Sequence, residues 1–596
     1  MEKLDGKTLD LTKENINTLK RLFPEVVTEG KVDFEKLKLV LGEEVDDRKE
    51  KYEFTWHGKA QSLKLAQTPS TGTLRPDKES SKNWDSTENL YIEGDNLEVL
   101  KLLQKSYFGK VKMIYIDPPY NTGHDFVYQD DFRDNIKNYK EITEQTAKSN
   151  SETSGRYHTD WLNMIYPRIK LARNLLTEDG VFFISIDDNE KDNLSKICGE
   201  IFGEENFLAT FSWRRTDNQS NIGNVAKVKE YILLYAKDKK AVKLNKMDLS
   251  DKAKKEYRYK DDNGYFRRAI LLHKTRGRHE YKVTTPTGKE LHGPWMITKP
   301  KMLEMIDNDE IYWTQGGEEQ PYGKIYLKDS EGQIISDWLT IDFGTNQRAA
   351  KEIEDLFNIR SFDFPKPTSL IKTFIKVATN SNDIILDFFS GSATTADATM
   401  QLNAERDGKR KFIMVQLPEL VNEKSKAYEA GYKNICEIGK ERIRRAGAKI
   451  VEKSGKSDLD IGFKVFKLDS SNLKTWDPDT ENLEQDLFDL QDNIKDGRSK
   501  EDLLYEILLK VGIPLTTPIE EVKLNDKVIY NVGFGGVLLC LEDEIDLDTV
   551  QEMIKLKPED FDTKVIFKET GFLNDSVKTN AIQTLKKNGI TDVRSV

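Results

Sequence analysis

The middle of the chain alternates short apolar runs with segments of helical periodicity. The apolar runs are rich in β-branched and aromatic residues and predict strands that are buried on both faces. Between them, residues 97–103 and 161–176 carry apolar side chains at helical spacing and predict amphipathic helices. This alternation predicts an α/β fold with a mostly parallel sheet. The predicted strands are a short one that leads into Gly94, one that ends at Asp387, and residues 111–116, 180–188, 207–213, 231–237 and 411–420.

The alternation is interrupted and then resumes, which predicts several structural regions. Residues 250–302 carry fourteen Lys/Arg against six Asp/Glu, and residues 469–492 carry eight acidic residues and one lysine. At 596 residues the chain is also too long for one hydrophobic core. We therefore predict a helical region (1–60), the first half of an α/β core (61–240), a basic insert (241–350), the second half of the core (351–465), an acidic linker (466–500) and a C-terminal α+β domain (501–596).

Composition narrows the class of protein. Charged residues make up 33% and hydrophobic residues 37% of the sequence, with no membrane-spanning apolar run and no signal peptide, which predicts a cytoplasmic protein. Cys198, Cys436 and Cys540 lie far apart without CxxC spacing, which argues against a zinc site or a disulfide. The net charge of −11 argues only weakly against a nucleic-acid partner, because the basic residues are clustered.

Asp117-Pro118-Pro119-Tyr120 directly follows the predicted strand 111–116. Proline cannot continue a central strand, so this turn is expected at the carboxyl edge of the sheet, where α/β folds bind ligands. A carboxylate and a proline carbonyl can accept both N–H groups of an aromatic amine and hold its nitrogen in line with an electrophile. Tyr120 offers a face on which the aromatic ring stacks. The alternative is an ordinary Asp-Pro turn.

A second candidate site is the sequence LDFFSGS at residues 386–392. Asp387 ends a predicted strand, Gly391 permits a tight turn, and the small residues 393–396 let a ligand approach the next helix. The turn is neither a Walker loop nor a full GxGxxG pattern, so alone it is equally typical of a structural turn. Gln416 ends the next predicted strand, where an α/β nucleotide site hydrogen-bonds a ribose.

Three motifs, in their order along the chain, carry a family resemblance. IEGDNLEVLKLL (92–103), DPPYNTG (117–123) and DFFSGS (387–392) resemble the S-adenosylmethionine-dependent DNA amino-methyltransferases of the β group, in which the catalytic motif precedes the cofactor motif. Together with YILLYAK and KFIMVQLPE, they are similar to the modification (Mod) subunits of type III restriction-modification systems. The resemblance implies a Rossmann-like methyltransferase core of circularly permuted motif order, with an inserted target-recognition region and a C-terminal α+β domain.

The resemblance also implies a reaction and the residues that perform it. The implied reaction is methylation of adenine N6 in a short asymmetric DNA sequence with S-adenosylmethionine as the cofactor, and Asp117, Pro118, Pro119 and Tyr120 would hold the flipped base. Ala393 and Gln416 depart from the pattern, because many relatives have a glycine and an acid there. The residues implied to bind the cofactor are Asp95, Lys366, Thr368, Asp387, Phe389, Ser390, Gly391 and Gln416.

The basic insert is the predicted DNA-reading region. Its cations are interleaved with tyrosines and a phenylalanine, which suits contacts to phosphates and bases, although a charge run is also typical of a solvated surface. The candidate DNA-binding residues are Arg258, Lys260, Arg267, Arg268, Lys274, Arg276 and Arg278.

Other functions remain open from the sequence. Cytosine N4 methylation uses the same fold, although Asp rather than Ser at position 117 favours adenine. An orphan DNA methyltransferase, a DNA-binding scaffold without activity, and a methyltransferase of RNA or protein glutamine are further alternatives. The chain has no Walker loop, so a role in restriction requires another polypeptide. The resemblance implies a homodimer that binds double-stranded DNA and an ATP-dependent restriction (Res) subunit.

Overall fold

The computed structural model describes two compact units. One comprises Met1–Lys243 and Asp337–Val596, and the other comprises Leu244–Ser336, within the predicted insert 241–350. Most of the predicted acidic linker, residues 475–493, lies outside the described residues. The described residues are 2–4, 7–28, 31–41, 53–122, 157–219, 221, 224–317, 319–474, 494–524, 526–559 and 562–596.

The larger unit is built around a sheet of ten described strands. Its central strands are parallel, which confirms the predicted Rossmann-like architecture, while β9 runs antiparallel between β7 and β8, and β4 runs antiparallel at one edge. In spatial order the strands are β16 (Trp338–Leu339), β8 (Phe207–Arg214), β9 (Lys229–Ala236), β7 (Leu176–Ile186), β6 (Val111–Ile116), β17 (Ile384–Asp387), β18 (Lys411–Gln416), β5 (Leu90–Glu93), β19 (Lys464–Ser470) and β4 (Gly72–Pro76).

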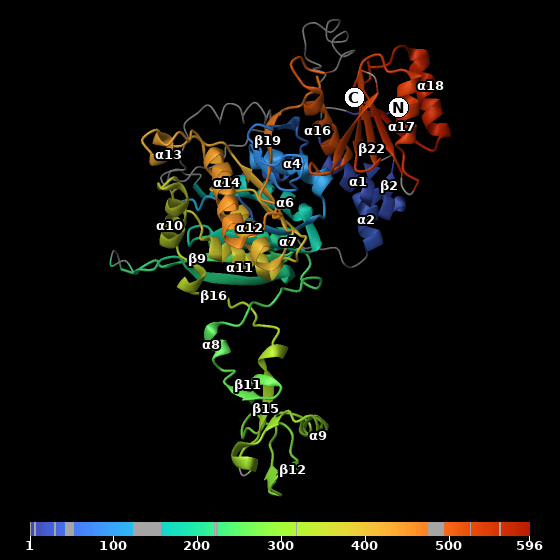
Figure 1. The fold of residues 1–596 in the computed structure, drawn as a ribbon. Coiled ribbons are helices and arrows are strands. Elements are labelled where there is room, and N and C mark those ends of the chain that lie inside the picture. Colours follow the sequence, from blue (N-terminus) through green and yellow to red (C-terminus); the bar gives the residue numbers. More distant parts are fainter. Residues whose placement is uncertain are drawn as a thin grey trace. The chain divides into compact units, whose positions relative to one another are not determined.

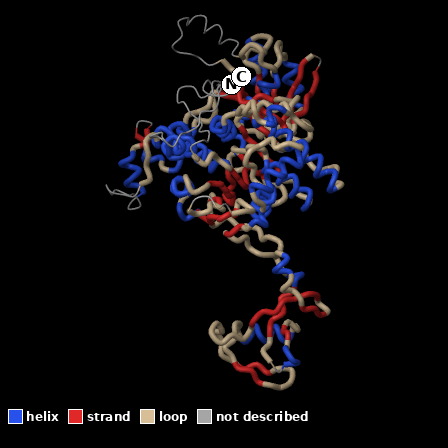
Figure 2. The backbone as a smooth tube through the Cα atoms, turned by 90° about the vertical axis from the view of Figure 1, so that its left-hand side faces the viewer, coloured by secondary structure: helices blue, strands red, loops and turns tan. Residues whose placement is uncertain are grey.

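Helices cover both faces of this sheet, as the blue helices on either side of the red strands show (Figure 2). On β18, Phe412 and Met414 pack with α12 and α14, whereas Ile413 and Val415 point to the opposite face, toward α4 and α6. Burial on both faces explains why the strands are apolar throughout. One face carries α11 (Thr368–Ala378), α12 (Thr394–Arg406) and α14 (Ile435–Ser454) with α10 (Asn346–Phe357), and the other carries α4 (Asn96–Tyr107), α6 (Tyr157–Leu175) and α7 (Lys191–Phe202) with α3 (Lys59–Gln67) (Figure 1).

The strands β6 and β17 are neighbours although they come from opposite halves of the sequence. They pair in parallel through Val111 with Ile384 and Ile114 with Leu386. Their carboxyl ends therefore meet at one edge of the sheet, at the position where α/β folds bind ligands. The insertion of unit 244–336 between the two halves leaves this pairing intact.

A second sheet lies in the C-terminal region, which confirms the predicted C-terminal α+β fold. The N-terminal segment adds its edge strand and contributes the helices α1 (Leu11–Leu22) and α2 (Phe34–Leu41). None of the described helices is long and apolar enough to cross a membrane. In order, the strands are β1 (Glu2–Lys3), β24 (Asp592–Ser595), β23 (Lys564–Phe567), β22 (Val537–Cys540), β21 (Lys527–Val532) and β20 (Ile519–Leu524), with α17 (Leu547–Lys555) and α18 (Asp575–Lys587) packed beside them.

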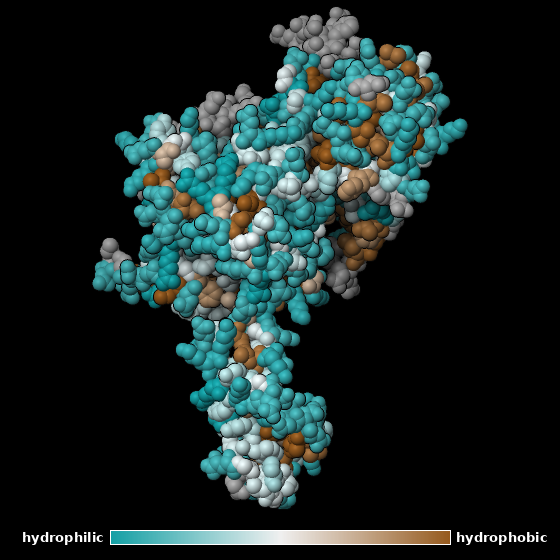
Figure 3. Space-filling view, viewed as in Figure 1, coloured by the Kyte–Doolittle hydropathy of each residue, from teal (hydrophilic) through white to brown (hydrophobic). Residues whose placement is uncertain are grey.

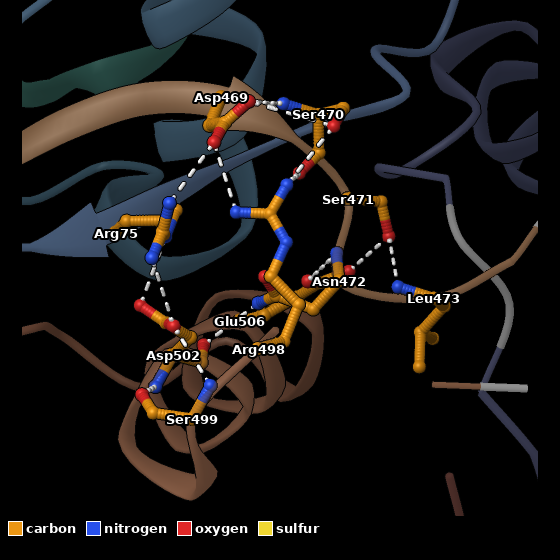
Figure 4. Close-up of polar contacts among 10 residues, drawn as sticks. All are labelled: Arg75, Asp469, Ser470, Ser471, Asn472, Leu473, Arg498, Ser499, Asp502 and Glu506. Carbon is orange, nitrogen blue, oxygen red and sulfur yellow. Dashed lines mark hydrogen bonds and ion pairs between the residues drawn. The ribbon is translucent and has the colours of Figure 1, made fainter. Parts of the chain in front are cut away.

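Helix α16 (Lys500–Val511) joins this C-terminal sheet to the core. Ser499 and Asp502 form a capping box that starts the helix, and the buried face of α16 packs against β4 and α4. The Asp502 carboxylate also accepts hydrogen bonds from Arg75 on β4, at 3.1 and 3.2 Å (Figure 4). Arg75 and Arg498 both pair with Asp469 on β19. Although it lies within the predicted domain 501–596, α16 is thus part of the core.

The smaller unit has its own four-stranded sheet and hydrophobic cluster, centred on Trp295. Much of its visible surface is hydrophilic (Figure 3). The sheet order is β10 (Tyr259–Asp261), β11 (Gly264–Ile270), β15 (Tyr322–Tyr326) and β14 (Ile311–Tyr312), accompanied by the hairpin β12 (Lys282–Thr284) and β13 (Glu290–His292) and by α9 (Lys299–Asp307).

Candidate active site at the edge of the central sheet

The turn that follows β6 is held rigidly by its neighbours. The indole N–H of Trp161 donates to the carbonyl of Pro119 at 2.7 Å, and the amide of Asn121 donates to the buried carboxylate of Glu190 at 2.7 Å. Asn121 has a φ of 59°, which turns the chain away from the strand. Since Trp161 uses the carbonyl of Pro119, the carbonyl of Pro118 is the better candidate to accept a hydrogen bond from a ligand.

Two groups from distant parts of the sequence meet Asp117 and Tyr120. The ammonium of Lys366 lies 2.8 Å from Asp117 Oδ2 and donates to the Tyr120 hydroxyl at 2.8 Å, and the Tyr120 hydroxyl donates to Asp117 Oδ1 at 2.8 Å. The same ammonium lies 4.9 Å from the centre of the Tyr120 ring. Burial disfavours the charge on Lys366, but the carboxylates of Asp117 and Glu230 outweigh it, so the pKa of the ammonium is raised. Lys366, predicted to bind the cofactor, thus contacts the predicted catalytic residues.

Glu230, at the start of β9, is the second carboxylate of this cluster. Its Oε2 lies 3.4 Å from Lys366 Nζ and 3.2 Å from the Tyr120 hydroxyl, and its Oε1 pairs with Arg215 at 3.0 Å. The side chain is only 4% exposed. Glu230 was not predicted as a site residue. An acidic residue at the beginning of an apolar strand could have indicated it, because a charge buried at that position requires partners.

The loop after β17 forms a cradle of small residues beside this cluster. Gly391 and Ala393 have φ angles of 50° and 61°, in the left-handed region, and a side chain at position 391 would come within 3.3 Å of Phe362. Ala393 therefore adopts a conformation that glycine adopts with less strain. Burial raises the pKa of the Asp387 carboxyl to about 7, although the Thr395 hydroxyl donates to it at 2.6 Å. A buried carboxylate at a small-residue turn suits a cationic ligand.

Several predicted cofactor residues are engaged in building the loop. The side chain of Gln416 accepts a hydrogen bond from the Gly391 amide at 2.7 Å. Asp95 caps α4 by accepting from the amides of Leu97 and Glu98, and it also pairs with Arg168 at 3.0 Å. The Ser390 hydroxyl, in contrast, is buried beside the loop and near the Tyr91 hydroxyl. Phe389 is 8% exposed beside it.

Arg442 of α14 ties this loop to the segment that contains Lys366. Its guanidinium is 1% exposed and donates to the hydroxyls of Ser392, Thr394 and Thr368 at 2.9, 2.7 and 3.0 Å. It also pairs with the buried Asp397 at 3.2 Å. Thr368 itself donates to Glu352 at 2.6 Å and so contributes to this framework. Arg442 was not predicted, because nothing near it in the sequence indicates these partners.

The predicted DNA-binding residues all lie in the smaller unit. On β11, Arg267 and Arg268 are neighbours, so their side chains point to opposite faces of the sheet. Arg267 stacks on Tyr257 at 5.8 Å, whereas Arg268 lies 4.6 Å from the rings of both Tyr259 and Tyr322. The remaining candidates lie near this sheet and its following turn: Arg258 and Lys260 on or beside β10, and Lys274, Arg276 and Arg278 after β11.

Comparisons with known proteins agree on one group of enzymes. A family model described as DNA methylase matches residues 111–444. The Mod subunit of the type III restriction-modification enzyme StyLTI from Salmonella typhimurium is 35% identical, over 76% of this chain and 72% of that protein. The EcoPI Mod subunit of Escherichia phage P1 and the EcoP15I Mod subunit of Escherichia coli are 32% and 31% identical, each over 91% of this chain and 92% of the relative.

Proposed function

The chain belongs to the family of type III restriction-modification Mod subunits, and we propose that it methylates N6 of adenine in a short asymmetric DNA sequence. Its activity is methyl transfer from S-adenosylmethionine to DNA, as the modification part of such a system. One observation carries the proposal: the Asp117–Tyr120 turn and the Asp387 loop follow neighbouring parallel strands. The Asp117–Tyr120 turn, which we call the amine clamp, and the Asp387 loop, which we call the cofactor cradle, therefore lie at the same edge of the sheet.

The cradle fits S-adenosylmethionine by its chemistry. The cofactor supplies an activated methyl group and carries an α-ammonium, which suits the buried carboxylate of Asp387. Ser390 offers a buried hydroxyl, and Gly391 keeps the loop free of a side chain. Thr368 and Gln416 hold the loop through Arg442 and Gly391, whereas direct contacts of Asp95, Lys366 and Phe389 to the cofactor remain predictions.

The clamp acts on the amine of the target base. Asp117 and the Pro118 carbonyl would accept its two N–H bonds, which makes the nitrogen a better nucleophile and aligns it with the methyl group. Tyr120 would stack on the flipped ring, since a base inside the duplex cannot reach the turn. Aspartate at position 117 supports adenine over cytosine N4 as the target.

Long-read sequencing of DNA from a host that expresses the protein tests this proposal, because it reports the modified base, the recognition sequence and the strand together. We expect N6-methyladenine on one strand of an asymmetric site. N4-methylcytosine would show that cytosine, and not adenine, is the target. Unmodified DNA together with methylated RNA or protein would exclude a DNA substrate.

Cofactor binding should depend on pH through Asp387. The carboxyl must lose its proton before it can pair with the ammonium of the cofactor, so affinity should rise as pH rises through about 7. Between pH 6 and 7.5, where the α-amino group stays mostly protonated, we expect the dissociation constant to fall about eightfold. Calorimetric titration measures this change, which Asp387→Asn should abolish; a flat profile in the unmodified protein would contradict the assignment.

The smaller unit should supply DNA affinity rather than cofactor affinity. Because Arg267 and Arg268 lie on opposite faces of β11, only one of them can face the same DNA surface. We expect one of the variants Arg267→Ala and Arg268→Ala to lower the slope of log affinity against log salt by about 1, and the double variant to add little more. Fluorescence anisotropy at several salt concentrations provides the slopes. Unchanged slopes in both single variants would place the DNA contacts elsewhere.

We further propose a cytoplasmic homodimer that associates with an ATP-dependent Res subunit. The relatives, each described as the Mod subunit of a type III restriction-modification enzyme, support association with a further subunit. Light scattering of the full chain should give twice the chain mass, and the protein should methylate without ATP and cleave no DNA alone. A monomeric full-length chain with full methylation activity would refute the dimer.

A further inference from the structure

The ammonium of Lys366 contacts the carboxylate that is proposed to bind the target amine. It lies 2.8 Å from Asp117 Oδ2, one of the atoms expected to accept an N–H bond of the base. It also donates to the Tyr120 hydroxyl at 2.8 Å, beside the ring on which the base is expected to stack. Its N–H groups therefore stand in for those of the target amine. Lys366 and the base cannot both occupy this position.

Glu230 offers Lys366 a second anion within the same cluster. Arg215 already neutralises Oε1 of Glu230, while Oε2 faces Lys366 at 3.4 Å and Tyr120 at 3.2 Å. Lys366 is buried. If its ammonium moved away from Asp117 and met no other negative group, the lysine would carry an unpaired buried charge, which is unfavourable. Because the ammonium already lies within ion-pair distance of both carboxylates, a small rotation of the flexible lysine side chain moves it from Asp117 toward Glu230.

We propose that Glu230 is a positioning residue that receives the Lys366 ammonium when the target amine takes its place on Asp117. In the base-free site Lys366 pairs with the Asp117 carboxylate. When the base enters, Lys366 moves to Glu230, and Asp117 becomes available to the amine without a loss of charge balance. The inference rests on the proposed function, since it needs a base that enters the clamp.

A fluorescent base tests the exchange before any chemistry occurs. DNA with 2-aminopurine next to the target adenine, which keeps its N6 amine, should brighten when that adenine leaves the stack. Glu230→Gln removes the second anion, so Lys366 stays on Asp117 and the DNA concentration for half-maximal signal should rise about tenfold. Lys366→Met removes the competing cation and should capture the base at least as well as the unmodified protein. The double variant should behave like Lys366→Met, because Glu230 acts through Lys366.

Each outcome decides between exchange and a merely structural ion pair. Base capture by Glu230→Gln equal to that of the unmodified protein, or a double variant worse than Lys366→Met, would overturn the exchange. Glu230→Asp keeps the charge and should capture the base better than Glu230→Gln. If Glu230→Gln loses cofactor binding, the test rests on Lys366→Met. Weaker base capture by Lys366→Met than by the unmodified protein would then refute the proposal. If the unmodified protein shows neither signal nor methylation, the proposed function fails as well.

Discussion

Replacing Asp117 with alanine is expected to lower the rate of methyl transfer by about 10² to 10³-fold while leaving cofactor and specific DNA binding largely intact. The carboxylate lies at the edge of the sheet, and in the proposed mechanism it acts on the reacting nitrogen and not on the phosphates of the DNA. Transfer of tritiated methyl groups to DNA gives the rate, and filter binding gives the affinity.

The matched control is Asp188→Ala. Asp188 is exposed near the end of β7, the strand that lies beside β6. Among the described residues it forms no hydrogen bond or ion pair with Lys366 or Tyr120. Its replacement should leave the rate within about twofold. If Asp117→Ala methylates DNA as fast as Asp188→Ala, Asp117 does not act on the target amine.

Replacing Arg442 with methionine should destabilise the larger unit by about 3–5 kcal/mol and abolish cofactor binding. The change leaves the carboxylate of Asp397 buried without its partner at 3.2 Å, and it releases the hydroxyls of Ser392, Thr394 and Thr368. Urea unfolding followed by tryptophan fluorescence measures the loss of stability, and equilibrium dialysis measures cofactor binding.

Lys449→Met on the same helix provides the comparison, since Lys449 is exposed and its loss also removes one positive charge. Its stability should change by less than about 0.5 kcal/mol. If both variants unfold at the same urea concentration and bind the cofactor equally, Arg442 does not hold the loop and the segment of Lys366 together.

Local sequence patterns predicted the parts of the site that are local. A β-branched run that ends in two prolines predicts a strand and a rigid turn, and β6 with Asp117–Tyr120 follows that prediction. The same holds for Asp387 and Gly391, because a strand, a tight turn and a helix follow one another within a few residues. The mostly parallel sheet was likewise predicted, but the antiparallel direction of β9 was not, since alternation of strand and helix alone does not give strand direction.

The parts that sequence patterns did not predict depend on contacts between distant segments. Glu230 and Lys366 meet Asp117 only because β9 and the segment before α11 reach the same edge of the sheet. Arg442 reaches Thr368 and Thr394 across a helix interface, and no local signal marks such a contact. The positions of Asp95 and Gln416 predicted contacts with a ligand, but both side chains also have structural roles. Asp95 caps a helix, and Gln416 holds the loop at Gly391. Residue type and position do not separate these roles.

The most direct test of the central claim is the identity of the methylated nucleoside. DNA methylated in vitro with deuterated S-adenosylmethionine can be digested to nucleosides and analysed by mass spectrometry, with the Asp117→Ala variant as the control. We expect deuterium-labelled N6-methyldeoxyadenosine with the unmodified protein and at most a trace with the variant. Labelled N4-methyldeoxycytidine, or no labelled nucleoside from DNA that contains the recognition sequence, would contradict the account.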